Sequence, residues 1–345
     1  MKLIDTKDAV GHVLCHDITR IIPGIEKGPV FKKGHVVTKE DIPVLLDVGK
    51  EHLYVWEKTE GILHEDEAAA ILKSICIGDD EHFNTSEPSE GKIEIYAATD
   101  GLLKIDTDRL NKVNSLGEMM IATIHGNLPV KAGQKLAGTR VIPLVIEQEK
   151  MDRAVQAAGE GGILSIRPFL HVRYGIVTTG SEVAAGRIKD AFGPVLMQKM
   201  SDYDTECLGQ VILSDDRGAI TEAIMQFVDK GADIVLVSGG MSVDPDDKTP
   251  GAIKDTGADI ISYGAPVLPG AMFLLSYLRS GDDREVPVLG LPGCIMYAGR
   301  TIFDLVLPRI LSGERLTAKD LSCYGEGGLC LSCDVCHFPN CQFGK

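Results

Sequence analysis

The sequence predicts an α/β protein in which a mostly parallel sheet, covered by helices on both faces, follows smaller β-rich units. Three observations lead to this prediction. From His171 onward, short apolar segments alternate with segments of helical spacing, as in a parallel sheet. Before that point, short strand candidates separated by turns dominate. The 345 residues also exceed the length of one ordinary domain.

The pattern divides the chain into four segments. They are a small β-rich unit at 1–60, a strand-rich α+β accessory domain at 61–165, the α/β domain at 170–312 and a cysteine-rich tail at 313–345. The net charge of -15 argues against nucleic acid or an anionic membrane as the main partner. The start of the chain has no apolar signal region, and no run reaches the roughly 18 apolar residues of a membrane span, so cytoplasm is expected.

The first two segments are expected to contain mainly short strands. Strands are predicted at Val10–Leu14, Ile18–Ile22 and His52–Trp56, with a strand, turn and strand over Phe31–Val37. Thr38 is expected to cap a short helix that ends at Gly49. In the accessory domain we expect a helix over 66–77, mostly strands over 93–146 and a connecting helix over 147–160.

The α/β domain is expected to alternate strands and helices. The predicted strands are 172–178, 233–237, 260–262, 272–278 and 286–291, and the predicted helices are 190–201, 217–230, 250–256 and 294–311. In such a sheet, ligands bind beyond the carboxyl ends of the strands. The candidate motifs all lie at such ends.

One loop combines the groups of a magnesium-assisted phosphate site. Ser238, Gly239 and Gly240 follow the apolar run Ile234–Val237 and can turn tightly, so that backbone N–H groups face an anion. Three carboxylates of the kind that hard cations prefer come next, followed by a threonine at a helix start: Asp244, Asp246, Asp247 and Thr249. A solvated acidic loop is the alternative interpretation.

Other strand ends carry weaker signals. Thr179, Gly180 and Ser181 can hydrogen-bond a phosphate, and Glu182 can bind a metal or accept a proton, although an ordinary turn has the same pattern. Asp215 and Asp216 precede a helix and are expected to cap it. Further strand exits lie at Pro269-Gly270 and at Leu291–Cys294. A helix starting after Gly293 would lower the pKa of Cys294, whereas a buried, inert thiol is the commoner outcome for a lone cysteine.

The tail concentrates five of the nine cysteines in its last 23 residues. The spacing of Cys330, Cys333, Cys336 and Cys341 matches the ligands of zinc or an iron–sulfur cluster, and His337 and Cys323 are possible substitutes. A short tail cannot bury a core, which favours a metal. A disordered, redox-active tail is the alternative.

Residues 171–312 resemble the molybdenum-cofactor biosynthesis domain of molybdopterin adenylyltransferases and molybdopterin molybdenumtransferases. The matching segments are Thr179–Glu182, Ser238–Val243 with Asp247 and Thr249, Val267–Gly270 and Gly290–Gly293. The part before residue 165 is more weakly similar to the accessory β domains of the molybdenumtransferase type, for example in Asn127–Gly133.

This resemblance implies a three-layer α/β/α fold and a pterin ligand with a dithiolene and a terminal phosphate. It implies that Glu182 and Asp247 bind Mg²⁺ or take part in metal insertion, and the acidic loop itself suggests Asp246 as a Mg²⁺ ligand beside Asp247. The residues expected to contact the cofactor are Thr179, Gly180, Ser181, Ser238, Gly239, Gly240, Met241, Ser242, Thr249, Pro269, Gly270, Pro292 and Gly293.

The sequence departs from the transferase pattern at four positions. Leu268 and Ala271 stand where the family has basic residues, Cys294 replaces an Asn, and Ser181 replaces an acidic residue. Each missing charge-assisted bond would weaken anion binding by about 1–3 kcal/mol.

Three hypotheses for function follow. The first is a molybdopterin-binding enzyme that inserts molybdate into (adenylated) molybdopterin with Mg²⁺, with tungstate as an alternative to molybdate. The second is a non-catalytic carrier or sensor that docks through its metal-bound tail to a molybdoenzyme or another cofactor-biosynthesis protein. The third is a nucleotide pyrophosphatase. Because related domains associate, a homo-oligomer is expected.

Overall fold

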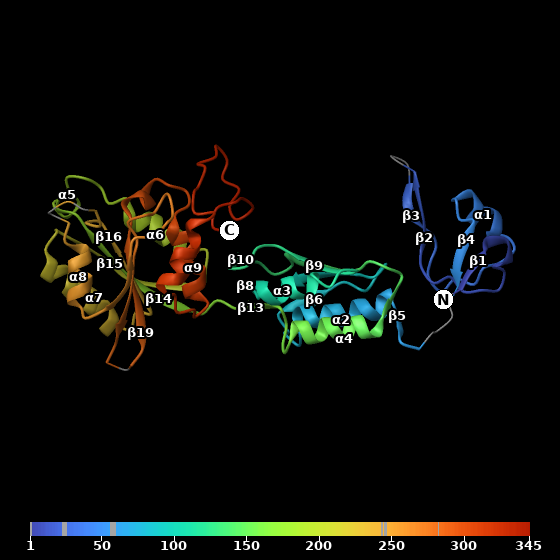
Figure 1. Cartoon of the computed structure of the whole chain (residues 1–345). Helices are drawn as coiled ribbons and strands as arrows, with labels where there is room; N and C mark the ends of the chain where they lie inside the picture. The colour runs from blue at the N-terminus through green and yellow to red at the C-terminus, as the bar shows by residue number, and fades with distance from the viewer. Residues whose placement is uncertain (1, 23–25, 56–59, 243, 245–246, 282) are drawn as a thin grey trace. The chain divides into compact units, whose positions relative to one another are not determined.

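A computed structural model of the chain describes residues 2–22, 26–55, 60–242, 244, 247–281 and 283–345 (Figure 1). The chain folds into two compact units. The first contains Met1–Thr99, Ile105–Ile124 and Lys131–Ile166, and the second contains Asp100–Lys104, His125–Val130 and Arg167–Lys345. The expected ligand site lies in the second unit.

The first part of unit 1 is built from short strands and one helix. They are β1 (Lys2–Asp5), β2 (Ile18–Ile22), β3 (Glu26–Phe31), α1 (Asp41–Asp47) and β4 (His52–Val55), with a 3-10 turn, η1, at Thr6–Asp8. β2 has the predicted bounds. The strand expected at Val10–Leu14 is wrong, because only isolated bridges form at Val13 and Leu14. Thr38 is not the helix cap either, since Glu40 holds that position.

The second part of unit 1 packs two helices against a sheet with the order β6-β7-β11-β9. The strands are β6 (Phe83–Thr85), β7 (Lys92–Ala97), β11 (Lys135–Val141) and β9 (Met119–Thr123). The helices α2 (Glu65–Ile77) and α4 (Gln148–Ala158) confirm two predictions, whereas α3 (Thr107–Asn114) lies inside the expected strand region. The remaining strands of unit 1 are β5 (Ile62–His64), β12 (Val145–Glu147) and β13 (Leu164–Arg167), whereas β8 (Gly101–Ile105) and β10 (Leu128–Val130) lie almost entirely in segments assigned to unit 2.

Unit 2 contains a six-stranded sheet with the order β15-β14-β16-β19-β18-β17. Its strands are β14 (Val172–Thr179), β15 (Thr205–Leu213), β16 (Ile234–Ser238), β17 (Asp259–Tyr263), β18 (Leu274–Arg279) and β19 (Glu285–Leu291). The pairings among β15, β14, β16 and β19 are parallel, and those that include β18 are antiparallel. The mostly parallel α/β sheet is therefore confirmed, with β15 added at one edge.

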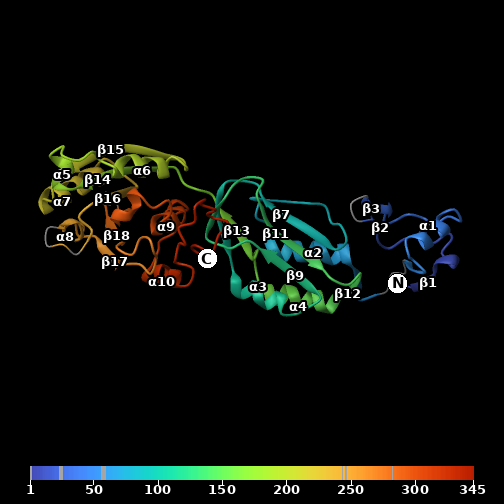
Figure 2. The same ribbon diagram turned by 90° about the horizontal axis from the view of Figure 1, so that it is seen from above.

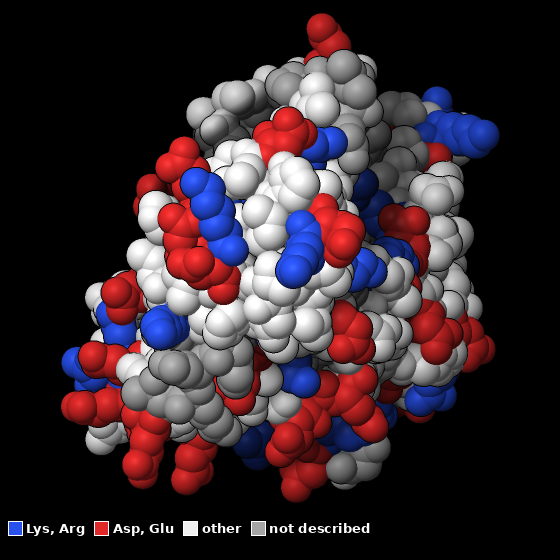
Figure 3. Space-filling model, turned by 90° about the vertical axis from the view of Figure 1, so that its right-hand side faces the viewer, with Lys and Arg blue, Asp and Glu red and all other residues white. Residues whose placement is uncertain are grey.

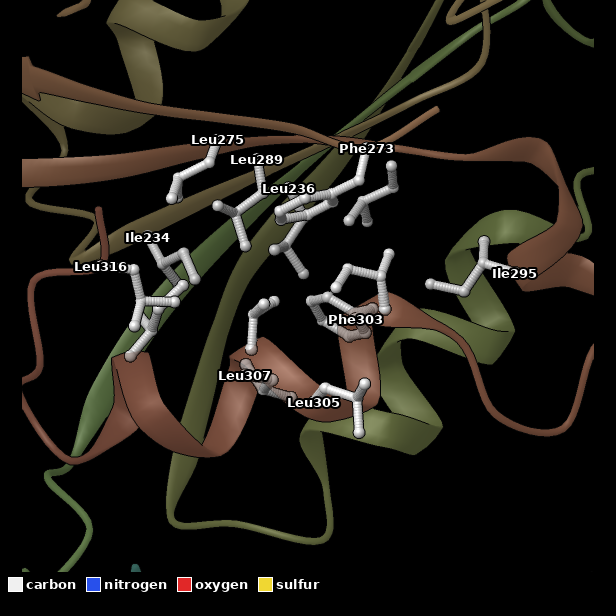
Figure 4. Packing of buried hydrophobic residues seen from close by; sticks show 14 of the residues in the cluster. Ile234, Leu236, Phe273, Leu275, Leu289, Ile295, Phe303, Leu305, Leu307 and Leu316 are labelled. Carbon is white, nitrogen blue, oxygen red and sulfur yellow. The ribbon is translucent and has the colours of Figure 1, made fainter. Parts of the chain in front are cut away.

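Helices cover both faces of this sheet, which gives the three layers seen in Figures 1 and 2. Successive side chains of β16 point to opposite faces of the sheet, and both faces are covered, so the whole apolar run is buried. Ile234 and Leu236 pack with Phe303 of α9 (Ile302–Leu311) on one face (Figure 4). Val235 and Val237 pack on the other face with residues of α7 (Arg217–Asp229) and α8 (Thr249–Asp255). The other helical segments are α5 (Ser181–Ala184), α6 (Phe192–Met200), η2 (Gly293–Met296), α10 (Ala318–Ser322) and η3 (Cys323–Gly325).

The helix expected over 294–311 is wrong in nearly its first half, over 294–301. Gly293–Met296 forms the 3-10 turn η2, and α9 begins only after Thr301, whose side chain accepts a hydrogen bond from the N–H of Phe303. The carboxylate of Asp304 in turn accepts a hydrogen bond from the N–H of Thr301 at 2.8 Å. This capping box fixes the start of the helix.

Charged side chains of both signs lie on the surface of the molecule. The face in Figure 3 shows acidic side chains gathered along its lower edge with basic side chains between them. Within the described part of the chain, no helix combines the length and the apolar character that crossing a membrane requires.

Candidate functional site

The carboxyl ends of three neighbouring strands open into one cavity of about 1180 Å³. β14 ends at Thr179, β16 at Ser238 and β19 at Leu291. The residues that follow these ends line the cavity: Thr179, Gly180, Ser181, Glu182, Gly239, Gly240, Met241, Ser242, Pro292, Gly293 and Cys294. The structure thus brings together motifs that lie more than a hundred residues apart in the sequence.

The double glycine is required by close packing between two strand ends. Gly239 has a φ of +88°, and a Cβ atom there would lie 2.0 Å from the carbonyl oxygen of Thr179. Gly240 has a φ of +55°. Both values are in the region that favours glycine, and the first position has no room for a side chain. The turn can therefore sit directly against β14 and present backbone groups to the cavity.

Ser238 and Thr249 do not reach the cavity as expected. The side chain of Ser238 is fully buried, and its hydroxyl lies 3.3 Å from that of Thr178. Thr249 is also fully buried, and its hydroxyl donates to the carbonyl oxygen of Gly239 at 2.8 Å. Both hydroxyls form their hydrogen bonds beneath the turn, so they hold its backbone in place.

The Pro-Gly exit also lies apart from the cavity lining. Pro269 faces a different cavity beside the tail, and Gly270 packs so closely on Ile302 that a Cβ atom would lie 2.7 Å from its side chain. Ala271 and Met272 are the residues of this loop that line the main cavity. The expected direct contacts of Pro269 and Gly270 with the ligand are therefore replaced by a packing role.

Four carboxylates line the cavity: Glu182, Asp215, Asp244 and Asp247. Asp246, the other expected magnesium ligand, lies outside the described residues. Oxygen donors of this type suit Mg²⁺.

Sequence reasoning missed the pocket position of Asp215, because it treated Asp215 and Asp216 together as helix caps. Asp216 does cap α7 by accepting from the N–H of Ala219 at 2.8 Å. Asp215 instead accepts bonds from both the N–H and the hydroxyl of Ser181, each at 2.9 Å. It therefore joins the Thr179–Glu182 turn to the loop after β15.

Cys294 is not an activated thiol. It lies in η2 and lines the cavity, but burial raises the pKa of its thiol above the usual range. The lowering expected from a helix start does not occur, because η2 is a single short turn and not the start of the long helix, and the inert thiol is the outcome found. The thiol is therefore mainly protonated at neutral pH.

Comparison with known proteins points to the same region of the chain. The sequence of residues 175–312 matches the family described as "Probable molybdopterin binding domain". This segment is a molybdenum-cofactor biosynthesis domain. Residues 3–57 match a separate family described only as a domain of unknown function.

Individual relatives match only part of this chain. A CinA-like protein of Mycolicibacterium gilvum is 40% identical over 81 residues, which is 23% of this chain and 19% of that protein. A CinA-like protein of Mycobacterium avium is 38% identical over 78 residues, or 22% of this chain and 18% of that protein. The chain thus spans about a fifth of the curated relatives it matches. The structure of the tungsten cofactor synthesizing protein MoaB from Pyrococcus furiosus has 21% identity and a TM-score of 0.35, and the match covers 42% of this chain and 98% of MoaB.

The molybdenum-cofactor domain also places positive charge in the cavity. Lys189, from the loop between α5 and α6, and Lys248, just before α8, line it together with the carboxylates. Sequence reasoning missed both lysines because neither belongs to a recognisable motif.

The tail docks on the molybdenum-cofactor domain. Phe343 is buried in the domain core, and Leu329 forms a parallel bridge with Leu268. A second cavity of about 360 Å³ is lined by four cysteines and a histidine of the tail: Cys330, Cys333, Cys336, Cys341 and His337. Cys323 is exposed and does not line this cavity. Among the described residues, no three His, Cys, Asp or Glu side chains are close enough together to hold a metal ion.

Proposed function

We propose that this chain holds molybdopterin, or its adenylated form, in the cavity at the strand ends and promotes magnesium-dependent insertion of molybdate. One observation supports this most directly. The same cavity combines the glycine turn after β16 with a threonine and a serine at the end of β14 and with four carboxylates of the described residues. Backbone and hydroxyl groups suit the polar edge of a pterin and its phosphate, while carboxylates suit a cation.

The roles divide between contact residues and supporting residues. Thr179, Gly180 and Ser181 would contact the ligand from one strand end, and the Gly239–Ser242 turn from the next. Pro292 and Gly293 would close the third side. Ser238 and Thr249 would act from beneath, by keeping the turn rigid.

Glu182 and Asp247 would bind Mg²⁺ with Asp246, and their carboxylates would fix its place beside the phosphate. When bound, Mg²⁺ supplies positive charge to phosphate oxygens. The proposal keeps the cytoplasm as the compartment and molybdate, or alternatively tungstate, as the inorganic substrate.

The test is to incubate the purified chain with adenylated molybdopterin, molybdate and Mg²⁺ and to measure AMP. Release of AMP is expected from the wild type. Glu182→Gln and Asp247→Asn should keep pterin binding but lose most AMP release. Asp229→Asn, an exposed residue of α7 outside the cavity, serves as the matched control. Binding without AMP release by the wild type would rule out the enzymatic step.

A second candidate is a carrier or sensor that binds finished cofactor and docks to a partner through a zinc or iron–sulfur site in the tail. The observation that favours it is the gathering of four thiols and His337 around one cavity. Binding of a metal would require these side chains to converge further than they do in this structure.

The second candidate is tested by substituting residues of the tail and not by deleting the tail, because Tyr324 and Phe343 of the tail are part of the domain core. Replacing Cys330, Cys333, Cys336 and Cys341 together by Ser keeps the packing of the tail. Metal analysis of anaerobically purified protein should show a metal in the wild type and none in this variant. If the variant keeps AMP release but loses capture of a molybdoenzyme, the tail is an adaptor. Wild-type protein without metal would contradict a metal-bound tail.

A further inference from the structure

The loop that carries basic residues in related transferases is neutral here and partly occupied by the tail. The N–H of Leu268 donates to the carbonyl oxygen of Gly328, and the N–H of Cys330 donates to that of Leu268, both at 2.8 Å. Leu268 does not line the main cavity, and Ala271, which does, has no charge. A negatively charged ligand must therefore find its cationic partners elsewhere in the cavity wall.

Lys189 lies in a loop whose backbone is firmly attached to the sheet. The next residue, Asp190, accepts bonds from the N–H groups of Phe192 at 2.9 Å and Gly193 at 3.0 Å. It also accepts from the side-chain amide of Gln210 on β15 at 2.7 Å. These bonds fix the backbone from which the Lys189 side chain enters the cavity.

Lys248 is fixed in a similar way from the opposite loop. It directly precedes Thr249, whose hydroxyl donates to Gly239 and whose N–H donates to the carbonyl oxygen of Gly240 at 3.3 Å. The lysine is therefore attached to the double-glycine turn itself. Two separate loops thus each place one ammonium group at the same cavity, next to an anchored residue.

The charges of the described residues that line the cavity make these two lysines decisive for the binding of a phosphate. Glu182, Asp215, Asp244 and Asp247 would repel a phosphate, and Lys189 and Lys248 are the cationic side chains among the described residues that line the cavity. A phosphate in this acidic wall is held best where ammonium groups reach it, because charge-assisted bonds are about twice as strong as neutral ones.

We propose that Lys189 and Lys248 bind the terminal phosphate of the pterin ligand and replace the missing basic residues of the Pro-Gly loop. This inference rests on the proposed function. It assigns the phosphate end of the ligand to the part of the cavity between the α5–α6 loop and the start of α8. The pterin ring is then left to the Gly239–Ser242 turn and the Pro292–Gly293 exit.

The test compares molybdopterin with the same compound after enzymatic removal of its phosphate, under anaerobic conditions. Lys189→Gln and Lys248→Gln should each weaken binding of the phosphorylated form about tenfold or more, since a hydrogen bond to a charged group is lost. Binding of the dephosphorylated form should change less than twofold. Lys254→Gln, an exposed lysine in the last turn of α8, is the control and should bind both forms as the wild type does.

The outcomes separate this inference from the proposed function. A lysine variant that binds both forms as the wild type does, or that loses affinity equally for both, overturns the assignment of that lysine. Wild-type protein that binds neither form overturns the proposed function and the inference with it. Circular dichroism of each variant confirms that affinity, and not folding, has changed.

Discussion

The hydroxyl of Thr249 donates a hydrogen bond to the carbonyl oxygen of Gly239 across 2.8 Å and lies 3.2 Å from the hydroxyl of Thr179. This one side chain therefore connects the start of α8 to two strand ends. All three groups are buried or half-buried, so the bonds compete little with water. The position of the acidic loop relative to the glycine turn depends on this contact.

Thr249→Val should reduce both stability and pterin affinity, because it leaves the carbonyl oxygen of Gly239 without this donor. A loss of about 1–3 kcal/mol in the free energy of unfolding is expected by urea denaturation. Thr221→Val is the matched control, since the Thr221 hydroxyl also donates to the backbone, shared between the carbonyl oxygens of Arg217 and Ala252, but lies outside the cavity. Equal effects of the two variants on pterin affinity would contradict a special role for Thr249.

Gly239→Ala should be among the most damaging small substitutions in this chain. The new methyl group would overlap the carbonyl oxygen of Thr179, and the φ of +88° is unfavourable for alanine. We expect a cost of about 3 kcal/mol or more, with loss of pterin binding.

Gly257→Ala provides the comparison for Gly239, because its φ is +83° but no atom lies within 4 Å of the position that the new methyl group would take. Gly257→Ala therefore measures only the cost of a positive φ for alanine, which should lower the free energy of unfolding by about 1 kcal/mol. Pterin binding should stay intact. Similar losses for both variants in urea denaturation would show that steric overlap at Gly239 is unimportant.

Glu65 should make the stability of unit 1 depend on pH. Burial, and next the negative charge of Asp66, raise the pKa of Glu65 to about 7 from its ordinary 4.5. Between these values the folded chain holds a proton that the unfolded chain has released, so stability falls as the pH rises. The fall should total about 3 kcal/mol.

Glu65→Gln should abolish this fall, because the amide does not titrate. Hydrogen exchange of α2 amides at several urea concentrations, repeated at pH 5 and pH 7, measures the difference between the variant and the wild type. A difference that stays constant over this pH range would mean that Glu65 is ionised in the folded chain.

Cys294 should react slowly with iodoacetamide at neutral pH, since the raised pKa leaves little thiolate. Mass spectrometry should show its labelling increasing steeply only in alkaline solution. After unfolding in urea, the same cysteine should be labelled as quickly as the other cysteines of the chain. Rapid labelling in the folded state would contradict the raised pKa of this half-buried thiol.

The sequence by itself predicted the mostly parallel α/β sheet and the edge of that sheet at which the candidate cavity lies. The β16 segment is a continuous apolar run because both faces of a central parallel strand are covered, and this pattern is readable without the fold. The same logic predicted that Thr179, Gly239 and Pro292 would meet at one edge, since parallel strands end on the same side. β15 was missed because an edge strand is only half-buried and lacks a continuous apolar run.

Only the tertiary structure decided which side chains face the cavity. Ser238 and Thr249 turn inward because buried partners satisfy their hydroxyls, and a motif does not specify that direction. Asp215 faces the cavity while its neighbour Asp216 caps a helix, because Ser181 offers two donors from a segment 34 residues away in the sequence. Lys189 reaches the cavity for a similar reason, since the bonds of Asp190 place its loop. Such choices depend on partners that are distant in sequence, so local pattern cannot reveal them.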